Sequence, residues 1–261
     1  MEKVKALPII VGGFYRSGTS LIRRLLDAHS RIHCGPEVKF FKDLRGDYLN
    51  DPLSHVRLFS TLPSLGLEMG EIRDIFGKAF VKAHEIAAGK AGKPRWADKN
   101  PENVLYLEEW RHLLPDGFVF VHVVRNPLDA LASLLEIGFP KAVPAAFEDK
   151  IKLLSTYIDA GSKYEALHPE MSFRVQYEDL VTSPTTTLES LFHWLGEDFE
   201  PHVLLNFNST ARGRGIEDPK VVATERVHTR SVGRWRTDLT SIQIELAENI
   251  LGISGRQHVV R

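Results

Sequence analysis

A glycine-containing turn near the start of the chain has residue types and spacing suited to anion binding. Residues 13–20 read Gly-Phe-Tyr-Arg-Ser-Gly-Thr-Ser, which is the spacing of a phosphate-binding loop. The lysine that usually follows the second glycine is replaced by Thr19, and Arg16 adds a positive charge inside the loop. Backbone N–H groups of such a turn, directed along the following helix, bind an anion whatever its chemistry. The sequence therefore predicts an anion site at this loop.

A second anion site is predicted after residues 118–124, an apolar run typical of a strand buried on both faces. The run is followed by Arg125, at the place where a nucleotide hydrolase has the aspartate that holds magnesium. Ser133 lies two turns along the helix predicted to follow, so a cation and a hydroxyl can converge on a second phosphate. The alternative is that Arg125 pairs with Asp129 as a surface ion pair.

These two sites require a strand, a loop and a helix each, and the hydrophobic pattern supplies them. The apolar run 7–13 is followed by apolar residues at helical spacing over 21–29, and the same order recurs after residue 118. Two strand-to-helix units predict an α/β fold with a mostly parallel sheet. The remaining predicted elements are a strand at 172–175 and helices near 71–88, 102–114, 147–167, 184–195 and 241–251.

Composition narrows the functional classes. The 261 residues are 43% hydrophobic and 26% charged with a formal net charge of −1, so no bulk field gathers nucleic acid or an anionic membrane. The apolar runs reach only strand length, and the opening residues have no signal-peptide core. The single Cys34 cannot form an intrachain disulfide. We therefore expect one cytoplasmic, enzyme-sized domain spanning residues 1–261, with neither a nucleic-acid nor a membrane partner.

Three segments, in order along the chain, resemble the donor-binding motifs of sulfotransferases that use 3′-phosphoadenosine 5′-phosphosulfate. They are residues 15–20, 124–133 and 231–236. Within that superfamily, residues 16–37 are more similar to protein-tyrosine sulfotransferases and their bacterial relatives than to the cytosolic hormone and phenol enzymes, which carry lysine at the position of Arg16. The resemblance implies a three-layer, P-loop-like fold with helices flanking the central sheet, and metal-independent sulfuryl transfer.

The resemblance also implies a donor site. Arg16 would lie against the bridging oxygen and the transferring group, and residues 17–20 would hold the 5′-phosphate. Arg125 and Ser133 would bind the 3′-phosphate. The donor-binding residues implied in this way are Arg16, Ser17, Gly18, Thr19, Ser20, Arg125, Ser133, Tyr177 near the adenine, and Arg234 in the closing loop. Ile137 departs from the tyrosine enzymes, which have another arginine there.

Two further residues match catalytic positions of the family. Lys99 matches a lysine that approaches the sulfuryl group, with pairing to Asp98 as the alternative. Glu37 matches the general base, and a carboxylate is suited to accept a hydroxyl proton; alternatively it only holds Arg16 or Lys39 in place. The serine that assists the transition state in the family has two candidate counterparts, Thr224 and Ser231.

The acceptor is predicted to be a small molecule with a hydroxyl or amine, because the chain has neither a membrane anchor nor a disulfide pair. Residues 38–70 and 206–230 are expected to line its pocket. Two other functions compete with this interpretation. A P-loop kinase using ATP and magnesium is opposed by Thr19 and Arg125, and a non-catalytic nucleotide-binding protein would not need Glu37. A metal cluster of His29, His33, Cys34 and Glu37 lacks any paired motif elsewhere.

Overall fold

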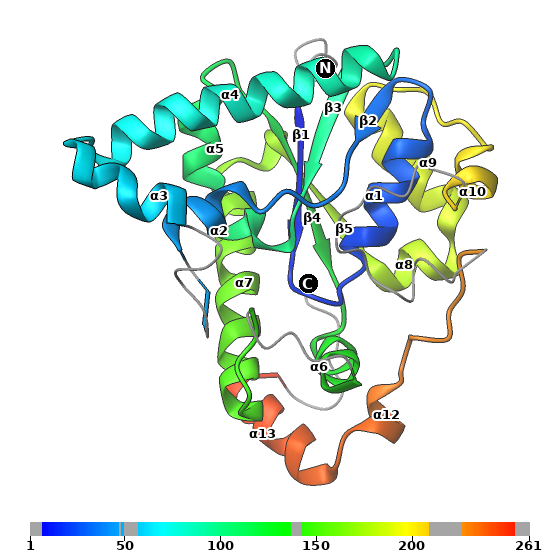
Figure 1. Cartoon of the computed structure of the whole chain (residues 1–261). Coiled ribbons are helices and arrows are strands. Elements are labelled where there is room, and N and C mark those ends of the chain that lie inside the picture. The colour runs from blue at the N-terminus through cyan, green and yellow to red at the C-terminus, as the bar shows by residue number, and fades with distance from the viewer. Residues whose placement is uncertain (1–6, 47, 50–56, 137–141, 209–225, 254–261) are drawn as a thin grey trace.

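A parallel five-stranded sheet forms the centre of the structure, which is a computed structural model (Figure 1). The structure describes residues 7–46, 48–49, 57–136, 142–208 and 226–253. The strand order is β2-β3-β1-β4-β5, and all neighbouring pairs are parallel. The strand bounds are Ile9–Gly13 for β1, Ile32–Cys34 for β2, Arg95–Lys99 for β3, Val119–Val124 for β4 and Ser172–Gln176 for β5.

The central strands are buried on both faces because helices cover the sheet on each side. Every residue of β1, β3 and β4 is buried. In β1, Ile9 lies opposite Ala97 of β3 on one side and opposite Val119 of β4 on the other. Since the strands run in the same direction, the loops that follow β1, β3 and β4 all leave the sheet at its carboxyl edge, which is where ligands bind in open α/β sheets.

Helices form the two outer layers. Figure 1 shows α1, α8, α9 and α10 to one side of the sheet and α2, α3, α5 and α7 to the other, with α4 running across the top. The bounds on the first side are Thr19–Ala28 (α1), Tyr177–Thr182 (α8), Pro184–Leu195 (α9) and Val203–Asn206 (α10). On the other side they are Phe40–Arg45 (α2), Arg57–Thr61 (α3), Leu107–Leu113 (α5) and Phe147–Leu167 (α7), and the helix across the top is Met69–Lys90 (α4).

The remaining helices lie near the carboxyl edge. The helix α6 (Pro127–Glu136) follows β4, and α12 (Trp235–Asp238) and α13 (Ser241–Leu251) close the described chain. Leu131 of α6, Ile151 of α7 and Ala247 of α13 belong to one apolar cluster, which fixes these helices to each other (Figure 1). Three short 3₁₀ helices complete the list: Leu62–Leu65 (η2), Pro101–Leu105 (η3) and Pro169–Met171 (η4).

The predicted α/β class, the parallel sheet and most predicted elements are confirmed. Two strands, β2 and β3, were not predicted from the sequence. The single helix predicted over 102–114 is wrong, because the chain forms η3 first and α5 only after Tyr106. None of the described helices combines the length and the apolar character that a membrane crossing requires.

Candidate active site

The phosphate-binding loop connects β1 to α1, as the sequence predicts. Gly18 precedes α1 with a φ of +98°, and a Cβ there would come within 2.5 Å of the Tyr177 ring. Only glycine meets both conditions, since it has no Cβ and tolerates positive φ. Arg16 also has a positive φ, +66°, which is uncommon for a residue with a side chain and is found mostly where function requires it.

The two predicted anion sites adjoin, because the loop is hydrogen-bonded both to the residue after β4 and to α6. Arg16 Nε donates to Ser133 Oγ at 3.0 Å. Arg125 Nη1 donates to the carbonyl oxygen of Arg16 at 2.7 Å. Ser133 and Arg125 are 2% and 6% exposed, so these contacts are shielded from water. Arg16 of the loop, Arg125 after β4 and Ser133 of α6 are thereby brought together although they are far apart in the sequence.

Arg125 is held on several sides. Its guanidinium lies over the Tyr177 ring, 4.6 Å from the ring centroid, and Nη2 donates to the carbonyl of Ser231. Burial lowers the pKa of Arg125, although an arginine remains charged at any pH of interest. Its Nε is buried and has no hydrogen-bond partner among the described residues. A buried donor without a partner is costly, and an anionic oxygen would satisfy it.

Asp129 does not form the surface ion pair considered above as the alternative for Arg125. It is 1% exposed, and its carboxylate accepts hydrogen bonds from two backbone N–H groups of the segment 231–236. Gly233 N lies 2.7 Å from Oδ2, and Trp235 N lies 3.0 Å from Oδ1. Asp129 and Arg125, one turn apart at the start of α6, thus both hold the segment that contains Ser231.

The structure does not bring Arg234 into contact with the phosphate-binding loop. Its guanidinium pairs with Glu136 at 2.8 Å and with Asp238 at 2.5 Å. Burial lowers the pKa of Arg234, but the bonds to these two carboxylates outweigh that effect and raise it. Ile137 and Thr224 lie outside the described residues.

Two of the residues predicted to be catalytic, Lys99 and Glu37, are in contact, whereas the third, Arg16, bonds to Ser133. The side chain of Lys99 is fully buried at the end of β3, where Nζ lies 3.2 Å from Ser20 Oγ and contacts Glu37 Oε1. Glu37 is 14% exposed, in the loop between β2 and α2. Lys99 therefore joins the phosphate-binding loop to the carboxylate predicted to be the base.

Asp98 is not the partner of Lys99, because consecutive strand residues point to opposite faces of a sheet. Its Oδ1 accepts hydrogen bonds from Asn100 and Asn103, each at 2.8 Å, and its Oδ2 lies 3.3 Å from His84 Nε2 of α4. Asn100 also donates to the carbonyl of Val38 at 3.1 Å. The Asp98 network thus fixes the backbone next to Glu37.

A buried carboxylate that sequence reasoning missed, Glu102, lies beside this group. Its Oε1 is 2.5 Å from Tyr15 Oη and 2.6 Å from Lys39 Nζ, and Lys42 Nζ is 3.5 Å away. Burial alone would raise the pKa of Glu102, but Lys39 and Lys42 outweigh it and lower it to about 2. Burial and Glu102 together raise the pKa of Tyr15 well above its usual value. In the sequence, Glu102 follows Pro101 at the start of a predicted helix, where an acidic residue stabilises the first turn. Nothing else in the sequence marked it as a site residue.

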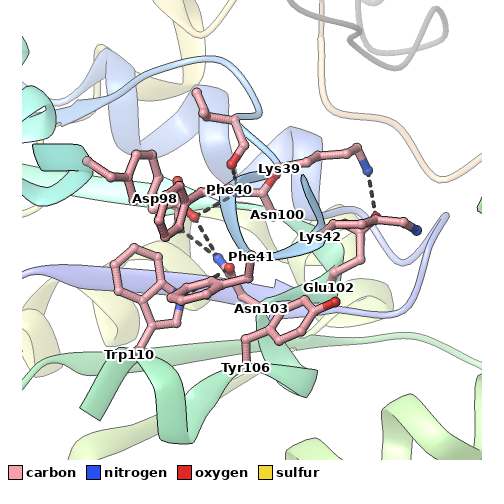
Figure 2. Close-up of a pocket in the computed structure, with 12 residues that line it drawn as sticks. Lys39, Phe40, Phe41, Lys42, Asp98, Asn100, Glu102, Asn103, Tyr106 and Trp110 are labelled. Carbon is pink, nitrogen blue, oxygen red and sulfur yellow. Dashed lines mark hydrogen bonds and ion pairs between the residues drawn. The ribbon is translucent and has the colours of Figure 1, made fainter. Parts of the chain in front are cut away.

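A narrow cavity opens next to Glu102 (Figure 2). Aromatic rings of α2, α4 and α5 form part of its wall, and Figure 2 shows Lys39 and Glu102 at one side of it. The lining residues are Val38, Lys39, Phe40, Phe41, Lys42, Phe80, Asp98, Asn100, Glu102, Asn103, Tyr106 and Trp110. Val38, Lys39, Phe40, Phe41 and Lys42 fall within residues 38–70, one of the two segments predicted to line the acceptor pocket; most of 206–230 lies outside the described residues.

The four residues considered as a metal cluster have other partners. His29 Nε2 lies 2.9 Å from the carbonyl oxygen of Asp198, and His33 lies 3.3 Å from Asp27. Burial raises the pKa of the Cys34 thiol to about 12. Among the described residues, no group of three or more histidine, cysteine, aspartate or glutamate side chains is arranged to hold a metal ion.

Known proteins are similar to this chain in sequence and in fold. A protein-tyrosine sulfotransferase of Drosophila melanogaster is 25% identical over 88% of this chain, and the nodulation protein NoeE of Sinorhizobium fredii is 25% identical over 95%. The chain spans 47% of the length of the first and 65% of the second. The solved sulfotransferase domain of the Synechococcus PCC 7002 olefin synthase shares the fold, with a TM-score of 0.60 and 22% identity over 93% of this chain and 94% of that domain.

The match to a family model is the more specific finding. Residues 8–201 match the model described as the sulfotransferase family, which covers the loop, β3 with Lys99, and the α6 site. The chain therefore belongs to the sulfotransferase family, and it is a sulfotransferase.

Proposed function

We propose that this enzyme transfers a sulfuryl group from 3′-phosphoadenosine 5′-phosphosulfate to the hydroxyl, or amine, of a small-molecule acceptor. The observation that carries the proposal is the position of Lys99, which contacts Glu37 and lies 3.2 Å from Ser20 of the phosphate-binding loop. One buried cation thus adjoins both the predicted donor site and the predicted base. Sulfuryl transfer needs this proximity, because the sulfur atom moves from a phosphate oxygen to an acceptor oxygen close to it.

The donor's nucleotide is assigned to the site around Arg125. The 5′-phosphate is assigned to the N–H groups at the start of α1, and the 3′-phosphate is assigned to Arg125 and Ser133. The unsatisfied Nε of Arg125 supports this assignment, since a phosphate oxygen is a strong acceptor for it. Tyr177 is assigned to the nucleotide side through its contacts with Arg125 and with the Gly18 turn.

The chemical step divides between Arg16, Lys99 and Glu37. As the S–O bond to the donor phosphate breaks, its electron pair stays on the phosphate oxygen, and Arg16 and Lys99 stabilise that developing charge. Loss of one such donor group typically costs ~2.7 to 4 kcal/mol. The acceptor oxygen forms the new S–O bond and gives its proton to Glu37, which acts as general base.

The names of the tyrosine enzymes similar to this chain point to a phenolic hydroxyl as one chemical type to test. A P-loop kinase is disfavoured because the chain has Thr19 in place of the usual lysine and Arg125 in place of a magnesium-holding aspartate.

Two measurements test the proposal. Calorimetry should show that adenosine 3′,5′-bisphosphate binds and that ATP with magnesium binds far more weakly. A mass-spectrometric screen with the phosphosulfate donor and a library of phenols, alcohols, amines and tyrosine peptides should reveal a product heavier by one sulfuryl group. Tight binding of ATP with magnesium, together with no sulfated product, would contradict the proposed function.

A further inference from the structure

Glu102 joins four parts of the active site at a single oxygen atom. It belongs to η3, which starts directly after Asn100, and it is 3% exposed. Its Oε1 accepts from Tyr15 of the phosphate-binding loop, from Lys39 of the segment that carries Glu37, and from Lys42 of α2. Its Oε2 is buried and has no partner among the described residues. This carboxylate can therefore bind one more donor without losing those it has.

Lys39 lies between two carboxylates and is closer to Glu102. Its Nζ is 2.6 Å from Glu102 Oε1 and 3.8 Å from Glu37 Oε2. Burial lowers the pKa of Lys39, but Glu102 and Glu37 outweigh burial and raise it, so Lys39 is an ammonium ion at neutral pH. Its side chain is 25% exposed, which leaves room for it to turn from one carboxylate to the other.

We propose that Glu102 is a positioning residue that draws the Lys39 ammonium away from Glu37 and so keeps Glu37 able to accept the acceptor's proton. The inference rests on the proposed function, in which Glu37 is the base. An ammonium bound to a carboxylate favours its charged form and weakens it as a base. Two cations flank Glu37, Lys99 of β3 and Lys39 of its own segment. On its far side Lys39 is restrained by Glu102, which Lys42 and Tyr15 also contact, and more weakly by the charge of Asp43.

The variant Glu102→Gln removes the charge that restrains Lys39. The ammonium should then turn to Glu37, and the acid limb of the kcat–pH profile should move to lower pH because Glu37 loses its proton more easily. A weaker base should also lower kcat on the plateau, by less than the 10²- to 10⁴-fold typical of complete loss of general-base catalysis. Gln keeps a carbonyl oxygen that can accept from Tyr15 of the phosphate-binding loop, so the KM for the donor should change less than kcat.

The variant Lys39→Met should move the acid limb in the opposite direction, because it removes a cation from beside Glu37. The double variant Glu102→Gln/Lys39→Met should follow Lys39→Met, since no ammonium is left to turn. A purely structural role for Glu102 predicts a different pattern, in which activity falls in step with stability and the acid limb stays in place. Glu85→Gln, which removes a half-exposed carboxylate paired with Lys82, is the matched control.

The experiment uses phenol as acceptor. Its hydroxyl, like that of tyrosine, has a pKa of about 10, so it stays protonated over the pH range of the acid limb. A crystal structure of Glu102→Gln supplies a readout that does not depend on turnover, namely the distance from Lys39 Nζ to Glu37. We expect hydrogen-bonding distance there, and the opposite shifts of the acid limb. If Lys39 stays away from Glu37 in that structure, or if both single variants shift the limb in the same direction, the role of Glu102 is refuted. If the wild type transfers no sulfuryl group to phenol or to any library acceptor, the proposed function fails instead, and the crystallographic distance alone decides the role of Glu102.

Discussion

Lys99 Nζ contacts Glu37 and lies 3.2 Å from Ser20 Oγ, so the predicted base and the phosphate-binding loop share one buried cation. A carboxylate held by an ammonium is a poor base. A donor whose sulfuryl oxygens attract Lys99 would release Glu37 at the moment when the base is needed. The arrangement thus favours a site in which binding of the donor prepares the proton acceptor.

Donor recognition is expected to depend on Arg125 through the 3′-phosphate. Arg125→Ala should weaken binding of adenosine 3′,5′-bisphosphate by about 1.5 to 3 kcal/mol, the range for hydrogen bonds to charged groups, and should change 5′-AMP affinity little. Arg125→Lys should recover only part of the loss, because lysine lacks the planar fork of donors. Calorimetry with both nucleotides checks this prediction, and Arg111→Ala, which removes an exposed arginine of α5, serves as control. Equal losses for the two nucleotides would show that Arg125 does not read the 3′-phosphate.

Asp129 is expected to stabilise the folded conformation of the segment 231–236. Its carboxylate accepts hydrogen bonds from Gly233 N and Trp235 N. An asparagine at this position would have no charge, and its NH₂ group, which is a donor, would lie opposite one of these two N–H donors. Asp129→Asn should therefore destabilise this segment by about 1.5 to 3 kcal/mol. Native-state hydrogen exchange should show faster exchange at both amides, whereas Asp238→Asn, on the exposed side of α12, should leave them protected. Unchanged protection in Asp129→Asn would contradict the assignment.

Glu102 is expected to make stability fall in acid. Its pKa is lowered from 4.5 to about 2 in the folded protein, so its contribution is fully present above pH 4.5 and is lost as the pH falls towards 2. A shift of this size corresponds to roughly 3 kcal/mol at neutral pH. Urea unfolding at pH 7, 4.5 and 3 should show a smaller loss of stability on acidification in Glu102→Gln than in the wild type. The same loss in both proteins would exclude Glu102 as its source.

The sequence was sufficient to predict the elements with clear periodicity. The apolar runs of β1 and β4 and the glycine turn after β1 follow from local pattern. The hydrogen bond from Arg125 to Arg16 was not predicted, because the sequence indicated two separate phosphate sites, although parallel strands end at one edge of a sheet. The resemblance to sulfotransferases supplied Glu37 and Lys99, which the structure brings into contact.

The strand β3 could not be predicted because its residues do not look apolar. It reads Arg-Trp-Ala-Asp-Lys, yet all five residues are buried. Each charge has a partner distant in sequence: Arg95 donates to the carbonyl of Leu7, Asp98 lies 3.3 Å from His84, and Lys99 contacts Glu37. Burial of charge depends on such tertiary partners, which no local pattern reveals. The Glu102 cluster escaped sequence reasoning for the same reason.

Turnover is expected to be independent of divalent metal ions. The residue after β4 is Arg125, where a magnesium-dependent phosphoryl transferase has a carboxylate, and the charge stabilisation is assigned to Arg16 and Lys99. Activity with the phosphosulfate donor should therefore persist after dialysis against EDTA. Loss of activity on chelation, followed by recovery with a divalent ion, would contradict this expectation.

The measurement that tests the role of Glu37 most directly is the kcat of Glu37→Gln for an alkyl alcohol and for a nitrophenol, alongside the affinity for adenosine 3′,5′-bisphosphate. The change is nearly isosteric, so nucleotide affinity should stay close to that of the wild type. With the alcohol, kcat should fall by about 10²- to 10⁴-fold, the range for loss of general-base catalysis, and the loss should be smaller with the nitrophenol, which gives up its proton more easily. A wild-type kcat with the alcohol, or a loss explained entirely by weaker nucleotide binding, would contradict the assignment of Glu37 as the base.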